Sequence, residues 1–576
     1  MKFIIKNTIT IILSVILINI VFGYINLNFD LTSDKRYTIS EESKKVLKSL
    51  EDKIYIKIYL DGNLPSEFEF FKNSMQTLLK NIRSVNSDLF EFDFNNPNIN
   101  DEEKKITLFN QLIDLGLSPT DIQINKDDSK ITQRIFPGAI VYYKDKTLAL
   151  NLLKNTANRS PSNSINHSIE NLEYEIISSI LKITKKENDK IAFLTGNGQL
   201  SADQIYDISY SVMNDNFNLS NYYDVERFNI KEYIIDSLSN KNNISFQIKR
   251  LLKYKVVIIA KPTLAFNDLD KYIIDQYIMN GGKVLWLVDG VKANMDSLRT
   301  QGGSFIAMKN NLNIDDQLFK YGVRINSDLI QDLRSAQIPI VTGYSNNIPQ
   351  QNFFTWPYYP ILYSQKKHSL SKNIDGVKCE FVSSIDLIKN NIKKTILIES
   401  SENSRLIFSP SNISLDVLRN PPPKSSFSDG RKTIGVLLEG KFESVYKNRI
   451  LPKDNSVLNF KESSIENKMI VISDGDIISN YVSKTGNIYP LGYDKYRKIT
   501  EAYPGNKYFL INLVQFLSDN QQLNLIKSKD LSLRMLDKKK IKKYRLTIEI
   551  INIILPVFIL SLFSILFKFY EKRRYA

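Results

Sequence analysis

The stretch KVLWLVD at residues 283–289 is apolar apart from its first and last side chains. Such a run predicts a parallel β-strand that is covered on both faces. VVIIA at residues 256–260 predicts a neighbouring strand, and the residues between the two runs show an amphipathic helix over 268–280. KIAFL at residues 190–194 and MIVIS at residues 469–473 are strands of the same type. This alternation of strands and helices predicts a doubly wound α/β sheet.

The doubly wound domain is interrupted along the chain. We expect it to comprise residues 188–294 and 466–525, with an inserted domain at residues 295–465. The insertion contains QNFFTWPYYPIL at residues 351–362, where five aromatic side chains and two prolines crowd together. The cluster could be an exposed docking surface or a buried plug, and the sequence leaves both interpretations open. The residues of the candidate surface are Phe353, Phe354, Trp356, Tyr358 and Tyr359.

Outward from the sheet, residues 30–155 predict a second α/β domain. IYIKIYL at residues 54–60 alternates in polarity as a half-buried strand does, and residues 65–85 carry apolar side chains at helical spacing. Residues 156–187 are predicted as an Asn/Ser-rich linker followed by a helix from residue 168. Further elements are expected in the domain as strands at 89–94, 139–143 and 147–152 and a helix at 101–115.

Both ends of the chain carry a long apolar run. IEIINIILPVFILSLFSILF at residues 548–567 has no charge after residue 549, and as a helix it approaches the ~30 Å thickness of membrane hydrocarbon. Residues 7–29 are also free of charge, and no alanine occurs before Ala139 to form a signal-peptidase site. We therefore predict an uncleaved N-terminal signal anchor over residues 1–29 and a C-terminal transmembrane helix.

Basic residues flank the C-terminal run on both sides. A basic tail at residues 568–576 follows it, and a juxtamembrane segment at residues 526–547 precedes it. Charges on the short tails favour cytoplasmic termini and a periplasmic body at the bacterial inner membrane. The juxtamembrane cluster favours the opposite orientation, unless it contacts lipid headgroups. Its members are Lys538, Lys539, Lys540, Lys542, Lys543 and Arg545.

Overall composition excludes several classes of function. The net charge is +15, from 77 Lys and Arg against 62 Asp and Glu, but acidic residues are interspersed with the lysines. A dispersed excess of this kind argues against a nucleic-acid partner. Cys379 is the only cysteine, so an intramolecular disulfide or a thiolate metal cluster cannot form. We predict no cofactor.

Motifs for common enzyme chemistries are weak. TGNG at residues 195–198 follows a strand, but it lacks the G-x-G-x-x-G spacing and no P-loop lysine accompanies it, so it is interpreted as a turn. The two histidines are His167, in the predicted linker, and His368, in a polar loop. Neither is placed by a motif beside Cys379 or a serine, and no catalytic residue is predicted from this chemistry.

Acidic side chains follow two predicted strands of the sheet. Asp474 and Asp476 come directly after the strand at residues 469–473, and Asp289 ends the strand at residues 283–289. Ligands collect at the carboxyl ends of strands in doubly wound sheets. An acidic cleft there could hold Mg²⁺ or Ca²⁺, or the side chains could simply cap the next helix. The cleft motivates an alternative function, that of a membrane-anchored hydrolase of the cell envelope.

Several short segments carry a resemblance through their order and spacing along the chain. They are LTSDKRYTIS (31–40), IYIKIYLDGNLPSEF (54–68), GGKVLWLVDGVKANMDSL (281–298), WPYYP (356–360), FESVYKNRI (442–450), ISDGDIISN (472–480) and GNKYFLINLVQFLSD (505–519). Together they resemble the GldG family of auxiliary membrane proteins in the gliding-motility ABC transporters of Bacteroidetes-type bacteria. The central domain also resembles the ABC-transporter auxiliary (GIFT-type) domain, which is related in fold to glutamine amidotransferases but lacks their catalytic residues.

The resemblance implies a non-catalytic subunit that works with a separate ATPase subunit and a multi-span permease, in gliding or in secretion linked to it. An additional envelope or periplasmic partner is also expected. The resemblance supplies no ligand-binding residues that can be transferred to this chain, and it indicates no cofactor.

Overall fold

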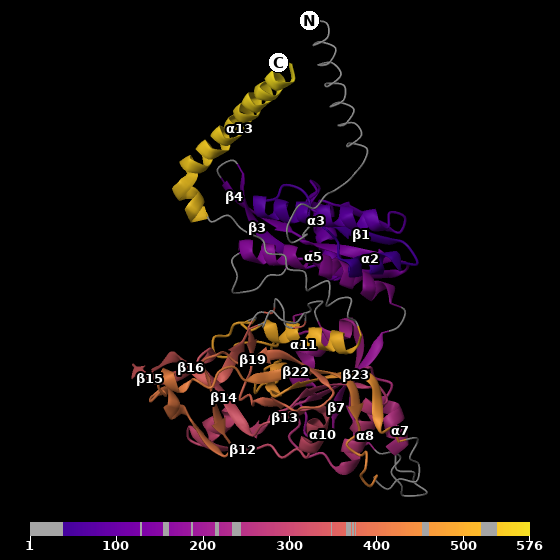
Figure 1. The fold of residues 1–576 in the computed structure, drawn as a ribbon, viewed down its shortest axis with the longest axis vertical. Coiled ribbons are helices and arrows are strands. Elements are labelled where there is room, and N and C mark those ends of the chain that lie inside the picture. The colour runs from indigo at the N-terminus through magenta and orange to yellow at the C-terminus, as the bar shows by residue number, and fades with distance from the viewer. Residues whose placement is uncertain are drawn as a thin grey trace. The chain divides into compact units, whose positions relative to one another are not determined.

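The computed structural model describes most of the chain (Figure 1). The predicted anchor at residues 1–29, His368 and the greater part of the juxtamembrane segment lie outside the described residues. By their internal contacts the residues form two compact units, Met1–Lys529 and Asp530–Ala576. The described ranges are 38–126, 129–153, 161–185, 188–213, 218–232, 244–346, 348–363, 370, 374, 376–451, 460–500, 502–519 and 538–575.

A four-stranded sheet with the order β2-β1-β5-β6 organises the N-terminal part of the first unit. In β1 the isoleucines are buried and alternate with half-buried residues, as the sequence pattern predicts. Helix α3 turns a buried apolar stripe toward the same core, because its apolar side chains recur every three or four residues. The elements are α2 (Glu41–Lys48), β1 (Ile54–Ile58), α3 (Ser66–Val85), β2 (Phe90–Phe94), α4 (Glu102–Asp114), β3 (Thr120–Lys126), β4 (Ser129–Ile135), β5 (Gly138–Tyr143) and β6 (Lys146–Asn151).

A seven-stranded sheet with the order β19-β22-β23-β10-β9-β7-β8 forms the centre of the unit. The strands from β8 to β23 in this order are parallel, whereas β22 pairs antiparallel with β23 and β19 pairs antiparallel with β22. The strands are β7 (Asp189–Thr195), β8 (Tyr223–Asn229), β9 (Val256–Ala260), β10 (Lys283–Leu287), β19 (Lys393–Glu399), β22 (Thr433–Glu443) and β23 (Ser463–Ile472).

Helices cover both faces of this sheet. Alternate side chains of β9 and β10 enter two separate hydrophobic clusters, one that includes α5 and α11 and another that includes α7, α8 and α10. Figure 1 shows α11 on one side of the sheet and α7 and α8 on the other. The predicted α/β class is therefore confirmed. The helices are α5 (Pro161–Thr184), α6 (Tyr206–Tyr210), α7 (Ile244–Leu251), α8 (Asp268–Met279), α10 (Asp315–Tyr321) and α11 (Gly505–Leu517).

The region expected as an inserted domain, residues 295–465, differs from its prediction. Two of its strands, β19 and β22, extend the central sheet beyond β23. Their apolar side chains provide the physical reason, since Val436, Leu437 and Leu438 in β22 are fully buried beside β23. The sheet therefore continues into the insertion instead of ending where the parallel strands end.

The remaining segments of this region form small sheets around a separate hydrophobic core. A long hairpin of β15 and β16 is its largest element. The strands are β11 (Val291–Lys292), β12 (Ser304–Lys309), β13 (Val323–Ile325), β14 (Asp328–Asp332), β15 (Ser335–Ser345), β16 (Ile348–Leu362), β17 (Val377–Lys378), β18 (Ile385–Leu387), β20 (Ser404–Phe408) and β21 (Ser411–Ser414), and one short helix is α9 (Met295–Thr300).

Helix α5 begins earlier than the sequence predicts. A loop was expected before residue 168, but the helix starts at Pro161. Proline is favoured in the first helical turn because its missing N–H has no intrahelical acceptor there. The helix packs on β5 and β6, and the Tyr174 hydroxyl donates to Oε1 of Gln515 in α11 at 3.4 Å. It therefore connects the N-terminal sheet with the central one.

The second unit is dominated by α13 (Lys538–Tyr575), which is kinked at Tyr544. Within α13, Tyr544–Tyr570 is long and apolar enough to cross a membrane, and its 18-residue apolar window is 0% buried. It is the only helix of this kind among the described residues. The predicted C-terminal spanning segment therefore exists as a helix, with its apolar side chains exposed.

Candidate functional site

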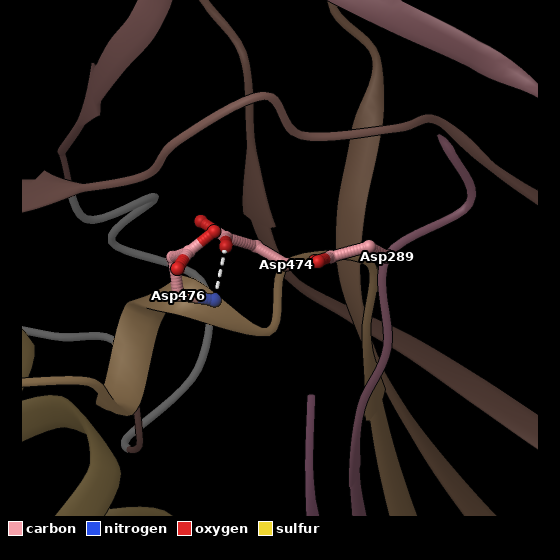
Figure 2. A group of neighbouring side chains, drawn as sticks. All are labelled: Asp289, Asp474 and Asp476. Atoms are coloured by element: carbon pink, nitrogen blue, oxygen red, sulfur yellow. Dashed lines mark hydrogen bonds between the residues drawn. The ribbon is translucent and has the colours of Figure 1, made fainter. Parts of the chain in front are cut away.

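Charged side chains converge at the carboxyl ends of three adjacent strands. Lys261 follows β9, Asp289 lies just beyond β10, and Asp474 and Asp476 follow β23. Because these strands are parallel, their carboxyl ends meet at one edge of the sheet. Carboxylate oxygens of the three aspartates lie within 4.8 Å of one another (Figure 2). The acidic cluster expected from the sequence is thus brought together by the fold.

Lys261 supplies the positive charge of this cluster. Its Nζ donates to both carboxylate oxygens of Asp476 at 2.5 Å and lies 3.8 Å from Oδ2 of Asp289. The ammonium therefore compensates the carboxylates in the way that a bound cation would. A divalent metal at these oxygens would have to displace or repel the lysine, so the arrangement favours an internal ion pair over a metal centre.

The carboxylate oxygens of Asp474 and Asp289 accept hydrogen bonds from backbone N–H groups of neighbouring loops. Asp474 accepts hydrogen bonds from the backbone N–H of Asp476 at 2.7 Å and of Glu380 at 3.0 Å. Asp289 accepts one from the backbone N–H of Gly475 at 2.5 Å. A Cβ atom on Gly475 would lie 2.6 Å from Cβ of Lys261, so only glycine allows this close approach. These contacts join the ends of β10 and β23 to the segment around Cys379.

Burial alters the protonation of the cluster. It raises the pKa of Asp289 to about 6 and that of Asp474 well above the usual range. The Cys379 thiol lies beside Asp474, and burial and that carboxyl group raise its pKa as well. The thiol is therefore neutral and inert.

His167 lies in α5 instead of a linker, where its ring is 3.8 Å from Glu170 and near Asn171.

A second ion pair lies beside the cluster. Lys378 donates to Oε1 of Glu380 at 2.5 Å. Although burial would favour the protonated acid, Lys378 and Lys495 lower the pKa of Glu380 to about 2. Burial of these two charges costs solvation free energy that their mutual attraction offsets. Neither Lys378 nor Glu380 could be identified from the sequence, because no motif connects residues 378–380 with the strand ends.

A cavity of about 440 Å³ opens next to these ion pairs. Its wall includes the side chains of Lys261, Lys378, Glu380 and Asp476, together with a tyrosine-rich loop that precedes α11. Lys261 could have been identified from its position directly after a buried strand, as the aspartates were. The loop residues between 481 and 496 follow no predicted strand, so the sequence gives no sign that they line the cavity. Only tertiary contacts place them there.

The TGNG turn at residues 195–198 is packed against the segment that follows β9. The Asn197 carbonyl accepts hydrogen bonds from the N–H groups of Thr263 and Leu264, both at 3.0 Å. A Cβ atom on Gly198 would lie 2.1 Å from Oγ1 of Thr263. The space that a phosphate would need is therefore filled, and the segment is a turn, as interpreted from its sequence.

Most of the aromatic cluster of β16 is buried. Trp356, Tyr358 and Tyr359 are 0%, 4% and 1% exposed and belong to the core of the inserted region. They therefore cannot form an exposed docking surface, and the buried alternative describes them. Phe353 remains 36% exposed and Phe354 is half-buried. The Phe353 ring is instead contacted by the guanidinium of Arg497, 4.6 Å from its centroid.

Comparison with known proteins identifies the family. Residues 188–513, more than half of the chain, match the ABC-transporter auxiliary family, which is described as an ABC-type uncharacterized transport system. The chain belongs to this family. Its membership indicates an auxiliary role in transport, and together with the apolar part of α13 it indicates association with a membrane. The resemblance noted from the sequence is thereby confirmed at the level of the ABC-transporter auxiliary family.

Other matches add coverage but no named activity. Residues 33–142 match a domain of unknown function, DUF7088. An uncharacterized protein of Borreliella burgdorferi is 23% identical over 444 residues, which is 74% of this chain and 76% of that protein. Among solved structures, the N-terminal domain of mmIFT52 aligns with a TM-score of 0.29 and 12% identity, over 57% of this chain and 97% of that domain.

Proposed function

We propose that this chain is a non-catalytic auxiliary subunit of an ABC transporter complex. It couples a large folded body to a permease subunit that works with a separate ATPase subunit, in gliding motility or in secretion linked to it. The observation that carries the proposal is the match of residues 188–513 to the ABC-transporter auxiliary family. The narrower assignment to gliding rests on the resemblance of the short segments to the GldG family.

The exposed apolar helix supports coupling to a membrane partner. Over Tyr544–Tyr570 the 27 residues extend about 40 Å at 1.5 Å per residue, more than the hydrocarbon thickness. Apolar side chains such as Leu560 and Phe563 are 69% and 67% exposed, an arrangement that water disfavours. Lipid or the helices of a permease are the environments that would cover them.

The ion pairs at the sheet edge support a non-catalytic role. A hydrolase that used Asp289, Asp474 and Asp476 would need a carboxylate free to bind a metal or to activate water. Instead, Lys261 and backbone N–H groups contact these carboxylates. We infer that the cluster stabilises the loops at this edge, and no contact among the described residues favours the hydrolase alternative.

The proposed topology has two membrane-spanning segments, residues 1–29 and 548–567, with both termini in the cytoplasm and the body in the periplasm. The juxtamembrane lysines, followed by Arg545, would then contact lipid headgroups on the periplasmic side. Protease treatment of spheroplasts tests this topology. Digestion of the body in intact spheroplasts is expected, whereas complete protection until lysis would overturn the orientation.

The function itself is tested by crosslinking in intact cells followed by purification of the full chain from detergent. We expect the permease and the ATPase to co-purify with it in a reproducible ratio. A matched sample with Ile559→Lys, which places a charge in the middle of the apolar helix, should lose both partners. Isolation of the unmodified chain as a clean monomer under the same conditions would contradict the proposal.

A further inference from the structure

The cavity beside the ion pairs has a wall of stacked tyrosines. The rings of Tyr489 and Tyr493 lie 4.4 Å apart at 19°, and the ring of Tyr481 lies 6.1 Å from that of Tyr493 at 18°. Two isolated β-bridges, Val482 with Ile488 and Asp494 with Ile499, hold the loop that carries them. Tyr481 and Tyr493 line the cavity, so the stack presents a preformed aromatic surface.

The cations that line the cavity are not equivalent. Lys261 and Lys378 are bonded to Asp476 and Glu380, so their charge is compensated within the chain. Lys495 has no such carboxylate within 4 Å among the described residues. Its Nζ lies 5.4 Å from the ring centroids of both Tyr481 and Tyr496, at a half-buried position.

The acidic groups around Lys495 are Asp296, Glu380 and Asp494, and each has a partner within the chain: Asp296 is paired with Arg299 at 3.5 Å. Burial lowers the pKa of Lys495, and Glu380, whose charge opposes that shift, is itself bonded to Lys378. The adjacent Asp494 accepts hydrogen bonds from the N–H groups of Tyr496 and Arg497 at 2.9 and 3.1 Å. Two tyrosine rings stabilise the half-buried ammonium only partly, because a cation–π contact is weaker than a charged hydrogen bond. An anion that enters the cavity would complete its coordination.

We propose that this cavity binds a small ligand that combines a flat ring with a carboxylate or phosphate group, the anion at Lys495 and the ring against Tyr481 and Tyr493. The volume, about 440 Å³, lies within the range of small-molecule sites. Arg299, whose guanidinium lies 6.0 Å from the ring centroid of Tyr496, is a second cation on the same wall, and Asp296 partly compensates its charge at 3.5 Å. Neither the family match nor the proposed coupling to a permease assigns this site.

The experiment is a binding titration on the purified full chain in detergent, with the heat of binding measured by calorimetry. The probes are adenosine 5′-monophosphate, 4-hydroxybenzoate, adenosine and inorganic phosphate. At least one of the two ring-bearing anions should bind at least about tenfold more tightly than either adenosine or phosphate, because the other probes lack the charge or the ring. Comparison of the first two probes distinguishes a phosphate from a carboxylate ligand.

Lys495→Gln should weaken binding of the preferred probe about tenfold or more, since a charge-assisted hydrogen bond is lost. Tyr481→Ala should weaken it about threefold to tenfold through the loss of stacking, while binding of inorganic phosphate stays unchanged. Lys498→Gln is the matched control, because Lys498 lies in the same loop, is exposed and does not line the cavity. Unchanged thermal unfolding midpoints establish that the variants are folded.

Equal binding of the ring-bearing anions by the unmodified chain and by Lys495→Gln would overturn the inference, and so would the absence of binding by both. The test is separate from that of the proposed function. Binding is measured without permease or ATPase, whereas co-purification is measured without added ligand, so either proposal can fail while the other stands.

Discussion

The carboxyl edge of the central sheet and helix α13 depart from ordinary protein structure in opposite ways. The sheet edge places ionisable side chains inside the protein, with the Asp474 carboxyl group fully buried, whereas α13 exposes apolar side chains. At the sheet edge each charge has found its partner within the chain, in Lys261 or in backbone N–H groups. The apolar surface of α13 has no cover within the described residues of its own unit. The sheet edge therefore needs no further partner for its charges, whereas the apolar surface of α13 needs lipid or another protein to cover it.

Removal of the internal cation should have the largest effect. Lys261→Met leaves Asp476 and Asp289 buried without their counter-charge, and loss of one partner of a buried ion pair costs about 3–5 kcal/mol. Denaturant unfolding followed by the fluorescence of the buried Trp286 and Trp356 measures the change. Lys393→Met, at an exposed pair with Glu439, is the control and should cost less than about 1 kcal/mol. Equal costs in the two variants would contradict the assignment of Lys261.

A charge in α13 should prevent its insertion into the membrane and leave the body intact. Ile559→Lys places an ammonium near the centre of the apolar run, where insertion becomes less favourable by about 3 kcal/mol. Because residues 1–29 would still anchor the chain, the measurement is the side of the C-terminal tail: a C-terminal epitope should become accessible to protease in intact spheroplasts, whereas in the control Ile559→Leu it stays protected. The tryptophan-detected unfolding of the body should not change. Protection of the epitope in Ile559→Lys equal to that in the unmodified chain would contradict the insertion of α13.

The buried carboxyl groups predict a pH dependence with two opposite signs. The pKa of Asp289 in the folded protein is about 6, above the value of 3.8 for the unfolded chain, so its contribution to stability is lost as the pH rises through 6. The pKa of Glu380 is about 2, below 4.5 for the unfolded chain, so its contribution is lost as the pH falls toward 2.

Unfolding curves recorded between pH 7 and pH 5 should therefore show a stabilising contribution from Asp289 that Asp289→Asn removes. Glu380→Gln should change the pH dependence only below about pH 4.5. If Asp289→Asn leaves the curve between pH 5 and pH 7 unchanged, the carboxyl group is not protonated in that interval, and the buried cluster carries more negative charge than we infer.

Asp474→Asn should have the smallest effect. Burial and neighbouring carboxylates raise the pKa of Asp474 well above its usual range, so asparagine replaces a neutral group of almost the same shape. Because both oxygens of Asp474 accept backbone N–H groups, the asparagine amide would place one N–H against another, and we expect the change in unfolding free energy to be about 1–3 kcal/mol. Abundance, co-purification of the transporter subunits and the transport-dependent phenotype should also persist in Asp474→Asn. Loss of the phenotype with normal abundance and assembly would instead favour the hydrolase alternative.

Much of the central fold could be predicted because its strands are continuous apolar runs. Residues 256–260 and the first part of 283–289 became β9 and β10, since a strand covered on both faces needs no alternation. The start of α5 was missed because an Asn/Ser-rich segment is more typical of a loop, although Pro161 suits a first helical turn. The strands β19 and β22 were placed outside the sheet because nothing in their own sequences indicates pairing with β23.

The candidate site was predicted in part for a related reason. Strand ends are visible in the sequence, and they located Asp289, Asp474 and Asp476 at one edge. Lys261 directly follows β9 and could have been located in the same way, but its pairing with Asp476, 215 residues away in the chain, is decided by the tertiary structure. The aromatic cluster around Trp356 had the composition of a docking surface and became a core, since only the neighbouring strands decide which face of a strand is covered.

The sequence by itself determined the α/β class, the apolar helix near the C-terminus and the absence of disulfide and thiolate-cluster chemistry. These properties follow from local periodicity, composition and residue counts. Only the tertiary structure decided that the acidic cluster is neutralised by Lys261, that Trp356 is buried, and that Lys495 lies between two tyrosine rings in a cavity. Such properties depend on contacts between distant residues, and no local pattern specifies the energy of those contacts.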